Sequence, residues 1–148
     1  MTMKAKDFKK IWDLRMTPLL AKDFGDGTFS SSDGRRIPVA VKTRTAKALV
    51  KYFGYETGLN FYSWTSDQFA QYGGKVTSPT MREATLVLDA ILDNETELNI
   101  ERHTTDTAGY TEIIFALFDL LGLQFDPRIR NIGDQWLYYI GDKPIMPI

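Results

Sequence analysis

Apolar residues recur at spacings of three and four in three segments of the chain, which is the pattern of an amphipathic helix. The segments are residues 4–21, 80–92 and 110–121. Ser78 or Thr80 can cap the second, and Glu83 lies near its first turn. The third is strongly apolar and is followed by Gly122, which suits a helix C-cap. We therefore expect helices over these three ranges.

Between and beyond these helices, short runs rich in β-branched and aromatic residues are bounded by turn residues, which is typical of strands. We expect five strands, at residues 28–41, 59–66, 72–78, 98–105 and 123–129. Residues 67–71 then form a hairpin connection, which favours antiparallel pairing of the second and third strands. Gly34 indicates a bulge or bend within the first strand, and Pro38 indicates an edge or irregular position.

The expected order after the leading helix is β-β-β-α-β-α-β, an α/β arrangement. Three sequential antiparallel strands followed by two crossover units is the order of the ribonuclease-H-like fold, a mixed sheet whose central first strand lies beside the fourth. We expect an N-terminal amphipathic helix and connection over residues 1–24 and a ribonuclease-H-like domain over residues 25–148. This order concerns architecture and does not by itself fix function.

Composition narrows the chemistry. A chain of 148 residues is about one domain, and 43% hydrophobic residues can furnish a sizeable core. No apolar run reaches the ~20 residues of a membrane span, and we expect no signal peptide. The absence of cysteine excludes disulfides, thiol catalysis and cysteine zinc sites, and one histidine makes a multi-histidine metal site impossible. Polar chemistry must therefore come from carboxylates, hydroxyls and bases.

The net charge of −1 hides an asymmetry along the chain. Residues 1–52 hold 12 Lys and Arg against 5 Asp and Glu, whereas the remainder holds 6 against 14. A basic third can contact nucleic-acid phosphates even when the total charge is near zero. The candidate DNA-binding residues are six bases in a stretch without acids: Arg35, Arg36, Lys42, Arg44, Lys47 and Lys51. A solvated surface would show the same charges.

Two aspartates are candidates for chemistry because the expected topology brings their strands together. Asp33 lies in the first strand, within Ser-Ser-Ser-Asp-Gly, and Asp106 lies where the fourth strand ends, just before a helix. Two carboxylates held close would repel each other, and a bound Mg²⁺ or Mn²⁺ removes that conflict. Such a pair suits two-metal phosphoryl transfer. On local sequence alone, Asp33 could be a turn residue and Asp106 a helix cap.

Four other polar residues could have a structural role, and three of them could instead contact a ligand. His103 lies three positions before Asp106, so the two-residue alternation of a strand points it to the opposite face, and we interpret it as structural. Asp67 and Gln68 either order the hairpin tip or contact DNA or the active site. Arg128, in the last extended segment, either contacts phosphate or is solvated at the surface.

Four stretches of the chain carry a family signature. They are Gly-Asp-Gly-Thr-Phe-Ser-Ser-Ser-Asp-Gly-Arg-Arg at 25–36, Phe-Tyr-Ser-Trp-Thr-Ser-Asp-Gln-Phe at 61–69, Thr-Asp-Thr-Ala-Gly-Tyr-Thr-Glu at 105–112, and Phe-Ala-Leu-Phe-Asp-Leu-Leu-Gly-Leu-Gln-Phe-Asp-Pro-Arg-Ile-Arg at 115–130. Together they resemble the transposases of the Tn3 family of replicative transposons. The resemblance implies an Asp-Asp-Glu catalytic domain with a ribonuclease-H-like fold, and it places the family's two catalytic aspartates on Asp33 and Asp106.

The resemblance also implies Mg²⁺ or Mn²⁺ held by Asp33 and Asp106, DNA (transposon ends and target) as the partner, and a bacterial cytoplasmic protein associated with the nucleoid rather than a membrane. The family's catalytic glutamate lies far beyond the second aspartate. Here 42 residues follow Asp106, and Glu112 is the only glutamate among them. We therefore expect a partial catalytic domain, truncated at its C-terminus, either naturally or by excision.

Three hypotheses follow for the activity of the chain. It is the N-terminal part of a transposase catalytic domain whose intact form nicks DNA and transfers the strand, or an inert module that binds DNA or an intact transposase, or a folded relic. For the isolated chain we expect weak binding of Mg²⁺ or Mn²⁺, negligible DNA cleavage and salt-sensitive DNA binding. We also expect a homo-oligomer formed through an apolar patch at residues 136–139.

Overall fold

The computed structural model describes residues 21–40 and 43–135. Nearly all of the expected helix at residues 4–21, the expected apolar patch at residues 136–139, and Lys42 lie outside the described residues. Within the described ranges, no helix has the length and apolarity that a bilayer crossing requires.

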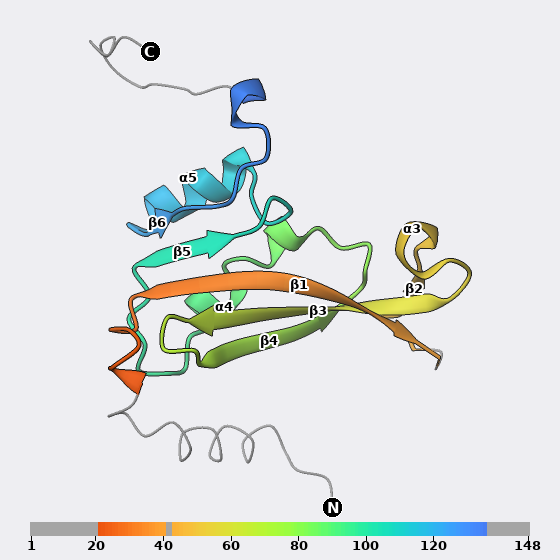
Figure 1. The fold of residues 1–148 in the computed structure, drawn as a ribbon, viewed down its shortest axis with the longest axis horizontal. Helices are drawn as coiled ribbons and strands as arrows, with labels where there is room; N and C mark the ends of the chain where they lie inside the picture. The colour runs from red at the N-terminus through yellow and green to blue at the C-terminus, as the bar shows by residue number, and fades with distance from the viewer. Residues whose placement is uncertain (1–20, 41–42, 136–148) are drawn as a thin grey trace, which may run out of the picture.

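A six-stranded mixed sheet forms the centre of the structure, and five of its strands overlap the expected ones, although β5 and β6 are shorter than expected (Figure 1). The strands are β1 (Phe29–Val39), β2 (Lys47–Ala48), β3 (Thr57–Ser66), β4 (Gln71–Thr77), β5 (Arg102–Thr105) and β6 (Gln124–Phe125). The short strand β2 was not expected from the sequence. In β3, every second residue from Gly58 to Ser66 is buried, which is the alternation that a strand with one core face requires.

The strand order is β2-β3-β1-β5-β6, and β4 pairs with β3 on the same edge as β2, farther along the strand. Strand β1 runs antiparallel to β3 and parallel to β5, and β5 runs parallel to β6. The first strand of the chain therefore lies beside the fourth main strand, β5, as the sequence predicts. Together with the helices, these pairings make the fold a mixed α/β arrangement.

Of the two expectations for Gly34, a bulge or a bend, the bulge is wrong. The pairing of β1 with β3 runs without a register shift from Ser30 to Val39, and the irregularity lies instead between Trp64 and Thr65, where β3 pairs with β4. The edge position expected for Pro38 is confirmed, because β1 pairs with β5 only up to Ser32 and one side of β1 is unpaired beyond that point within the described residues.

Beyond that point, β1 and β3 extend past their other neighbours as an arm, which we define as the described residues between 34 and 59. The arm carries β2 and the single-turn helix α3 (Val50–Phe53) at its end, on the right of Figure 1. Because the arm is held by β1, β2 and β3 alone, many of its apolar side chains are exposed, including Val50, Tyr52 and Tyr55.

The helix expected over residues 80–92 is wrong as a continuous element. The segment forms a 3₁₀ turn at Glu83–Thr85 and a single α-helical turn, α4, at Asp89–Leu92. The buried residues of the segment are Glu83, Ala84, Leu86 and Val87. They repeat every three positions, which fits a 3₁₀ geometry better than an α-helix. The Trp64 indole of β3 donates a hydrogen bond to the Val87 carbonyl at 2.9 Å and ties this segment to the sheet.

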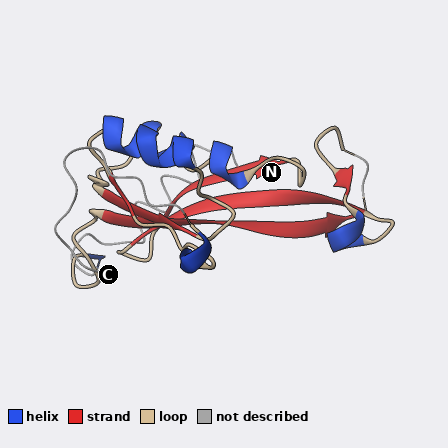
Figure 2. Ribbon diagram, turned by 90° about the horizontal axis from the view of Figure 1, so that it is seen from above, coloured by secondary structure: helices blue, strands red, loops and turns tan. Residues whose placement is uncertain are grey.

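Helix α5 (Glu112–Leu120) is the longest helix of the described residues and lies beside the sheet, which Figure 2 shows nearly edge-on. The Thr111 hydroxyl accepts a hydrogen bond from the Ile114 amide and caps its N-terminus. Gly122 follows its last turn with a φ of 71°, as a C-cap glycine does. Phe118 stacks on Phe125 of β6 at 4.4 Å between ring centroids, so α5 completes the core on this face.

His103 is fully buried in β5, and the interpretation that it is structural is confirmed. Its Nδ1 lies 2.7 Å from the Ser30 hydroxyl and its Nε2 lies 2.8 Å from the Ser32 hydroxyl, both in β1. The Tyr62 hydroxyl extends this chain of hydrogen bonds to β3 at 2.8 Å from Ser32. Burial lowers the pKa of His103 to about 4 from its ordinary 6.5, so the ring is neutral in the folded chain near pH 7.

We predict that stability falls as the pH is lowered from 6.5 to 4, because the unfolded chain then takes up a proton at His103 that the folded chain does not. The loss reaches up to about 3 kcal/mol of unfolding free energy at the lower end. Urea unfolding of the wild type and of His103→Gln at pH 7 and pH 4.5 measures it. Carboxylates titrate in both proteins, so the difference isolates His103. Equal pH dependence in the two proteins would contradict the prediction.

Candidate active site

The pairing of β1 with β5 brings two aspartates together. The last paired residues are Ser32 and Thr105, and Asp33 and Asp106 are the next residue of each strand. Because the two strands are parallel, the chain positions that follow the last pair lie at the same edge of the paired region. The sequence places Asp33 within a strand and Asp106 at a strand end, and the structure confirms both positions.

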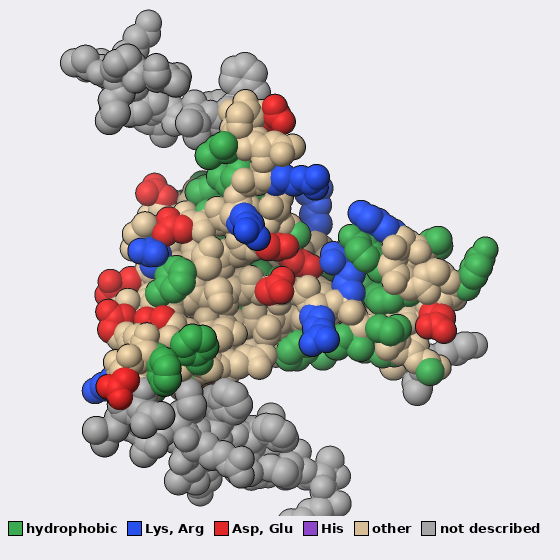
Figure 3. Space-filling model, in the orientation of Figure 1, with side chains coloured by type: hydrophobic (Ala, Val, Ile, Leu, Met, Phe, Trp, Pro, Cys, Tyr) green, Lys and Arg blue, Asp and Glu red, His purple; other side chains and the backbone are tan. Residues whose placement is uncertain are grey.

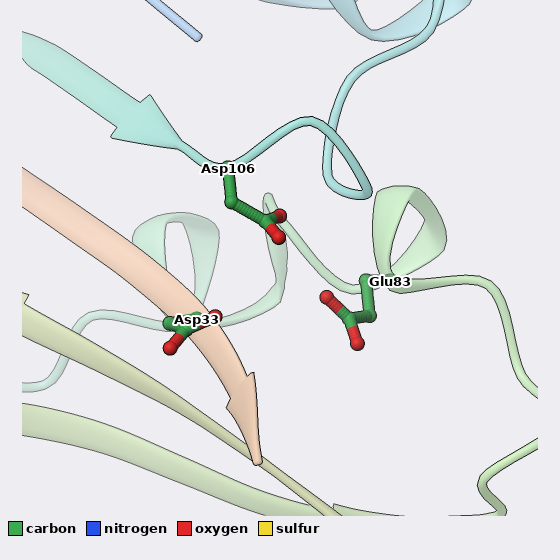
Figure 4. Close-up of side chains that lie close together, drawn as sticks. All are labelled: Asp33, Glu83 and Asp106. Carbon is green, nitrogen blue, oxygen red and sulfur yellow. The ribbon is translucent and has the colours of Figure 1, made fainter. Parts of the chain in front are cut away.

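Three carboxylates meet at this edge, from Asp33, Asp106 and Glu83 (Figure 4). One oxygen of each lies within 4.8 Å of an oxygen of the other two. The expected proximity of the two aspartates is therefore confirmed. Glu83 was not expected here, because the sequence pattern placed it in the first turn of a helix. Its one signal in the sequence, an acid beside apolar positions, is too common to identify a site residue.

The two aspartates are exposed and are oriented by backbone amides close to them in the chain. Asp33 Oδ1 accepts a hydrogen bond from the Gly34 amide at 2.8 Å, and Asp106 Oδ1 accepts one from the Ala108 amide at 3.0 Å. The second bond closes an Asx-type turn that directs the chain from β5 toward α5. The aspartates thus combine local order with access to solvent, as ligands of an exchangeable ion need.

Glu83 differs from the aspartates because it is buried, with 4% of its surface exposed. Arg36 of β1 lies beside it, with Nη2 at 3.4 Å from Glu83 Oε1. Burial is the largest cause that raises the pKa of Glu83. The negative charges of Asp106 and, more weakly, Asp33 raise this pKa further, while the Arg36 guanidinium lowers it. The site therefore concentrates negative charge that one arginine offsets only in part.

A hollow of about 310 Å³ opens between the ends of β1 and β5, beside the aspartates. Its lining consists of hydroxyls, carboxylates and one base: Ser31, Ser32, Asp33, Thr104, Thr105, Asp106 and Arg128. The Arg128 backbone is fixed here by its amide, which donates to the Thr105 carbonyl at 2.8 Å. Carboxylate oxygens are the ligands that Mg²⁺ and Mn²⁺ prefer, so this donor set fits a divalent ion.

Comparison with known proteins identifies the family. The sequence profile of the Tn3 transposase DDE domain matches residues 7–147. The chain belongs to this family. Among relatives, it is 50% identical over 117 residues to the transposase for transposon Tn1546 of Enterococcus faecium and 45% identical over 118 residues to that for Tn21 of Escherichia coli. It is 40% identical over 125 residues to the transposase for transposon gamma-delta of Escherichia coli strain K12.

These alignments cover most of this Tn3-family chain and a small part of each relative. They include 79%, 80% and 84% of the chain, respectively, but 12% of the length of each of the three transposases. The resemblance inferred from the sequence motifs is thereby confirmed. For this chain we therefore treat the activity of a complete transposase as a proposal.

The bases expected to bind DNA divide into two groups in the Tn3-family chain. Arg36 pairs with Glu83 and lies over the Tyr52 ring at 4.3 Å from its centroid, so it belongs to the carboxylate site. The other described bases are exposed on the arm: Arg35, Arg44, Lys47 and Lys51. Figure 3 shows acidic side chains near the centre of one face with Lys and Arg side chains around them.

Asp67 and Gln68, in the hairpin after β3, order the hairpin, which was one of the two roles expected for them. The Asp67 carboxylate accepts a hydrogen bond from the Gly27 amide, with Oδ1 at 3.1 Å, and the Gln68 side chain donates to the Gly25 carbonyl at 3.2 Å. These bonds attach the hairpin to the turn before β1. They explain the polar pair without a contact to DNA or to the carboxylate site.

We predict that Arg36→Met lowers the unfolding free energy by about 2 kcal/mol, because it leaves the buried Glu83 carboxylate without its cation. Adding Glu83→Gln should recover most of that loss, since the uncompensated charge is then gone. Urea unfolding at pH 7.5 measures both effects. Arg35→Met, at the exposed neighbouring position, is the matched control and should cost under about 0.5 kcal/mol. Equal losses in Arg36→Met and Arg35→Met would contradict the prediction.

Proposed function

We propose that this chain is part of a transposase catalytic domain in which Asp33 and Asp106 hold Mg²⁺ or Mn²⁺ for DNA strand cleavage and strand transfer. The observation that carries the proposal is the placement of the two aspartates side by side, directly after the last pair of β1 and β5, in a chain of the Tn3 transposase DDE domain family. Two carboxylates at one sheet edge, beside an open polar hollow, suit phosphoryl transfer.

We further propose that residues 25–148 form a ribonuclease-H-like domain. The parallel pairing of β1 with β5, the antiparallel hairpin β3–β4, and the helical connections before β5 and after it support this fold. Residues 1–24, of which 1–20 lie outside the described residues, stand apart from this domain in the proposal.

The chemistry follows from the residues that line the hollow. A divalent ion at the aspartates, when bound, would lower the free energy of the charge that develops on a phosphate under attack by water or by a DNA 3′-hydroxyl. Asp33 and Asp106 would hold the ion, and the backbone amides of Gly34 and Ala108 fix the orientation of their carboxylates. Arg128, which also lines the hollow, would contact the phosphate.

DNA would lie across the arm and the hollow. The exposed bases of the arm supply contacts to phosphates that do not depend on base sequence. Exposed Tyr52 and Tyr55 add aromatic surface beside these bases. This placement keeps Arg35, Arg44, Lys47 and Lys51 in the DNA-binding role, together with Lys42, and assigns Arg36 to the carboxylate site. The place of action would be bacterial DNA in the cytoplasm.

The metal part of the proposal is tested by Mn²⁺ binding to the chain, measured by isothermal titration calorimetry at pH 7.5. We predict that Asp33→Asn and Asp106→Asn each weaken binding at least about tenfold, because each removes a charged oxygen ligand. Asp93→Asn, at an exposed position away from the site, is the control and should leave affinity unchanged. A wild-type chain that binds no Mn²⁺ would refute the metal site.

The DNA part is tested by fluorescence anisotropy with a labelled duplex. We predict that affinity falls about 40-fold between 50 and 200 mM salt if three phosphates are neutralised, since each contributes a slope of about −0.9. Arg44→Ala with Lys47→Ala should lower both the affinity and the salt slope. The control is Lys75→Ala, because Lys75 lies off the arm and pairs with Asp89 at 2.6 Å. Salt-independent binding would remove the arm from the DNA-binding account.

A further inference from the structure

We propose that Glu83 supplies a third carboxylate ligand to the divalent ion that Asp33 and Asp106 hold. The inference rests on the proposed function of the two aspartates and adds a residue that lies between them in the chain. Its basis is the convergence of three carboxylates from three separate segments, β1, the 3₁₀ turn Glu83–Thr85 and the end of β5. All three of these ligands lie between residues 33 and 106.

The first support is an unpartnered buried oxygen. The Glu83 side chain is 3% exposed, and its Oε1 accepts no hydrogen bond among the described residues. The nearest cation, Arg36 Nη2, lies at 3.4 Å, which is an ion-pair distance without hydrogen-bond geometry. A buried carboxylate oxygen without such a partner is costly. Because the Glu83 carboxylate faces Asp33 and Asp106 (Figure 4), an ion shared with them would give this carboxylate a partner.

The second support is the space that Gly34 leaves for the Glu83 carboxylate. A Cβ at position 34 would meet Glu83 Oε1, Oε2 and Cδ closer than real Cβ atoms come to their neighbours. These Glu83 atoms are the three nearest that it would meet, and the φ of Gly34 is not in the left-handed region. Glycine at position 34 therefore lets the Glu83 carboxylate approach β1 closely, directly beside Asp33. It is not required there by a turn of the backbone.

The third support is charge. Three carboxylates lie within 4.8 Å of one another, and among the described residues Arg36 is the one base that forms an ion pair with them. A divalent cation is the species that balances this excess while accepting hard oxygen ligands. The two exposed aspartates are hydrated and can stay charged without a further partner. A charged Glu83 buried against them raises the free energy of the folded chain unless a cation is bound.

The experiment measures Mn²⁺ affinity by calorimetry, and the electron paramagnetic resonance signal of Mn²⁺ that remains free in solution gives an independent count of bound ions. We predict that Glu83→Gln weakens binding at least about tenfold relative to wild type. Glu97→Gln, which removes an exposed carboxylate elsewhere, should leave the affinity unchanged. Circular dichroism melts of the metal-free proteins check that each variant is folded.

Gly34→Ala provides a second, independent variant that keeps all three carboxylates. The added methyl group should displace Glu83 and weaken Mn²⁺ binding by a similar factor, and it should add nothing in a Glu83→Ala background. It also decides the matter if Glu83→Gln does not fold.

Wild-type affinity in both Glu83→Gln and Gly34→Ala, with loss in Asp33→Asn and Asp106→Asn, would overturn the role of Glu83 and leave the two-aspartate site intact. A wild-type chain without Mn²⁺ binding would overturn both. Loss in all four variants, with Glu97→Gln unchanged, supports the three-carboxylate site.

Discussion

The register of the parallel pair β1–β5 is the constraint on which the rest of the site depends. Asp33 and Asp106 face a common hollow only because Ser32 pairs with Thr105, so that the two acids follow the same rung of the ladder. A slip of one residue would move every side chain of β5 to the other face. The buried His103 opposes such a slip, because its two ring nitrogens lie at hydrogen-bond distance from Ser30 and Ser32 of β1. A neutral histidine of the core thus sets the geometry of the carboxylates.

The His103 network and the Glu83 cluster differ in how fully their polar atoms are hydrogen-bonded. The Ser30–His103–Ser32–Tyr62 network pairs its hydroxyls with the ring nitrogens, and aromatic rings of α5 and β6 exclude water from it. This network therefore stabilises the fold without a bound ligand. The Glu83 cluster is incomplete by comparison, with an oxygen and the Arg36 Nε both buried and without hydrogen bonds among the described residues. Buried polar groups without a partner call for an explanation, and a bound ion is one that fits the Glu83 cluster.

Periodicity predicted most of the strands and the helix α5, because these elements depend on local alternation and on caps such as Thr111 and Gly122. It also predicted that Asp33 and Asp106 meet, since strand order follows from the sequence of elements. It failed at residues 80–92, where apolar residues at spacings of three and four were interpreted as a continuous helix. Glu83 was missed for the same reason, because its place follows from tertiary packing beneath Gly34. The space at Gly34 likewise has no local signature, so a bulge was expected where the strand is regular.

Arg36 links the arm to the carboxylate site, and this connection limits how independently the two can act. Its guanidinium lies against Glu83 and over the ring of Tyr52, a residue of α3 at the end of the arm. Arg35, one residue earlier on β1, is exposed and makes no ion pair among the described residues. Two adjacent arginines of one strand therefore serve different surfaces, because successive side chains of a strand point to opposite faces. The position of the arm relative to the carboxylates is thus fixed from within the same strand that carries Asp33, and that shared backbone would set the distance between the proposed phosphate contacts of the arm and the hollow.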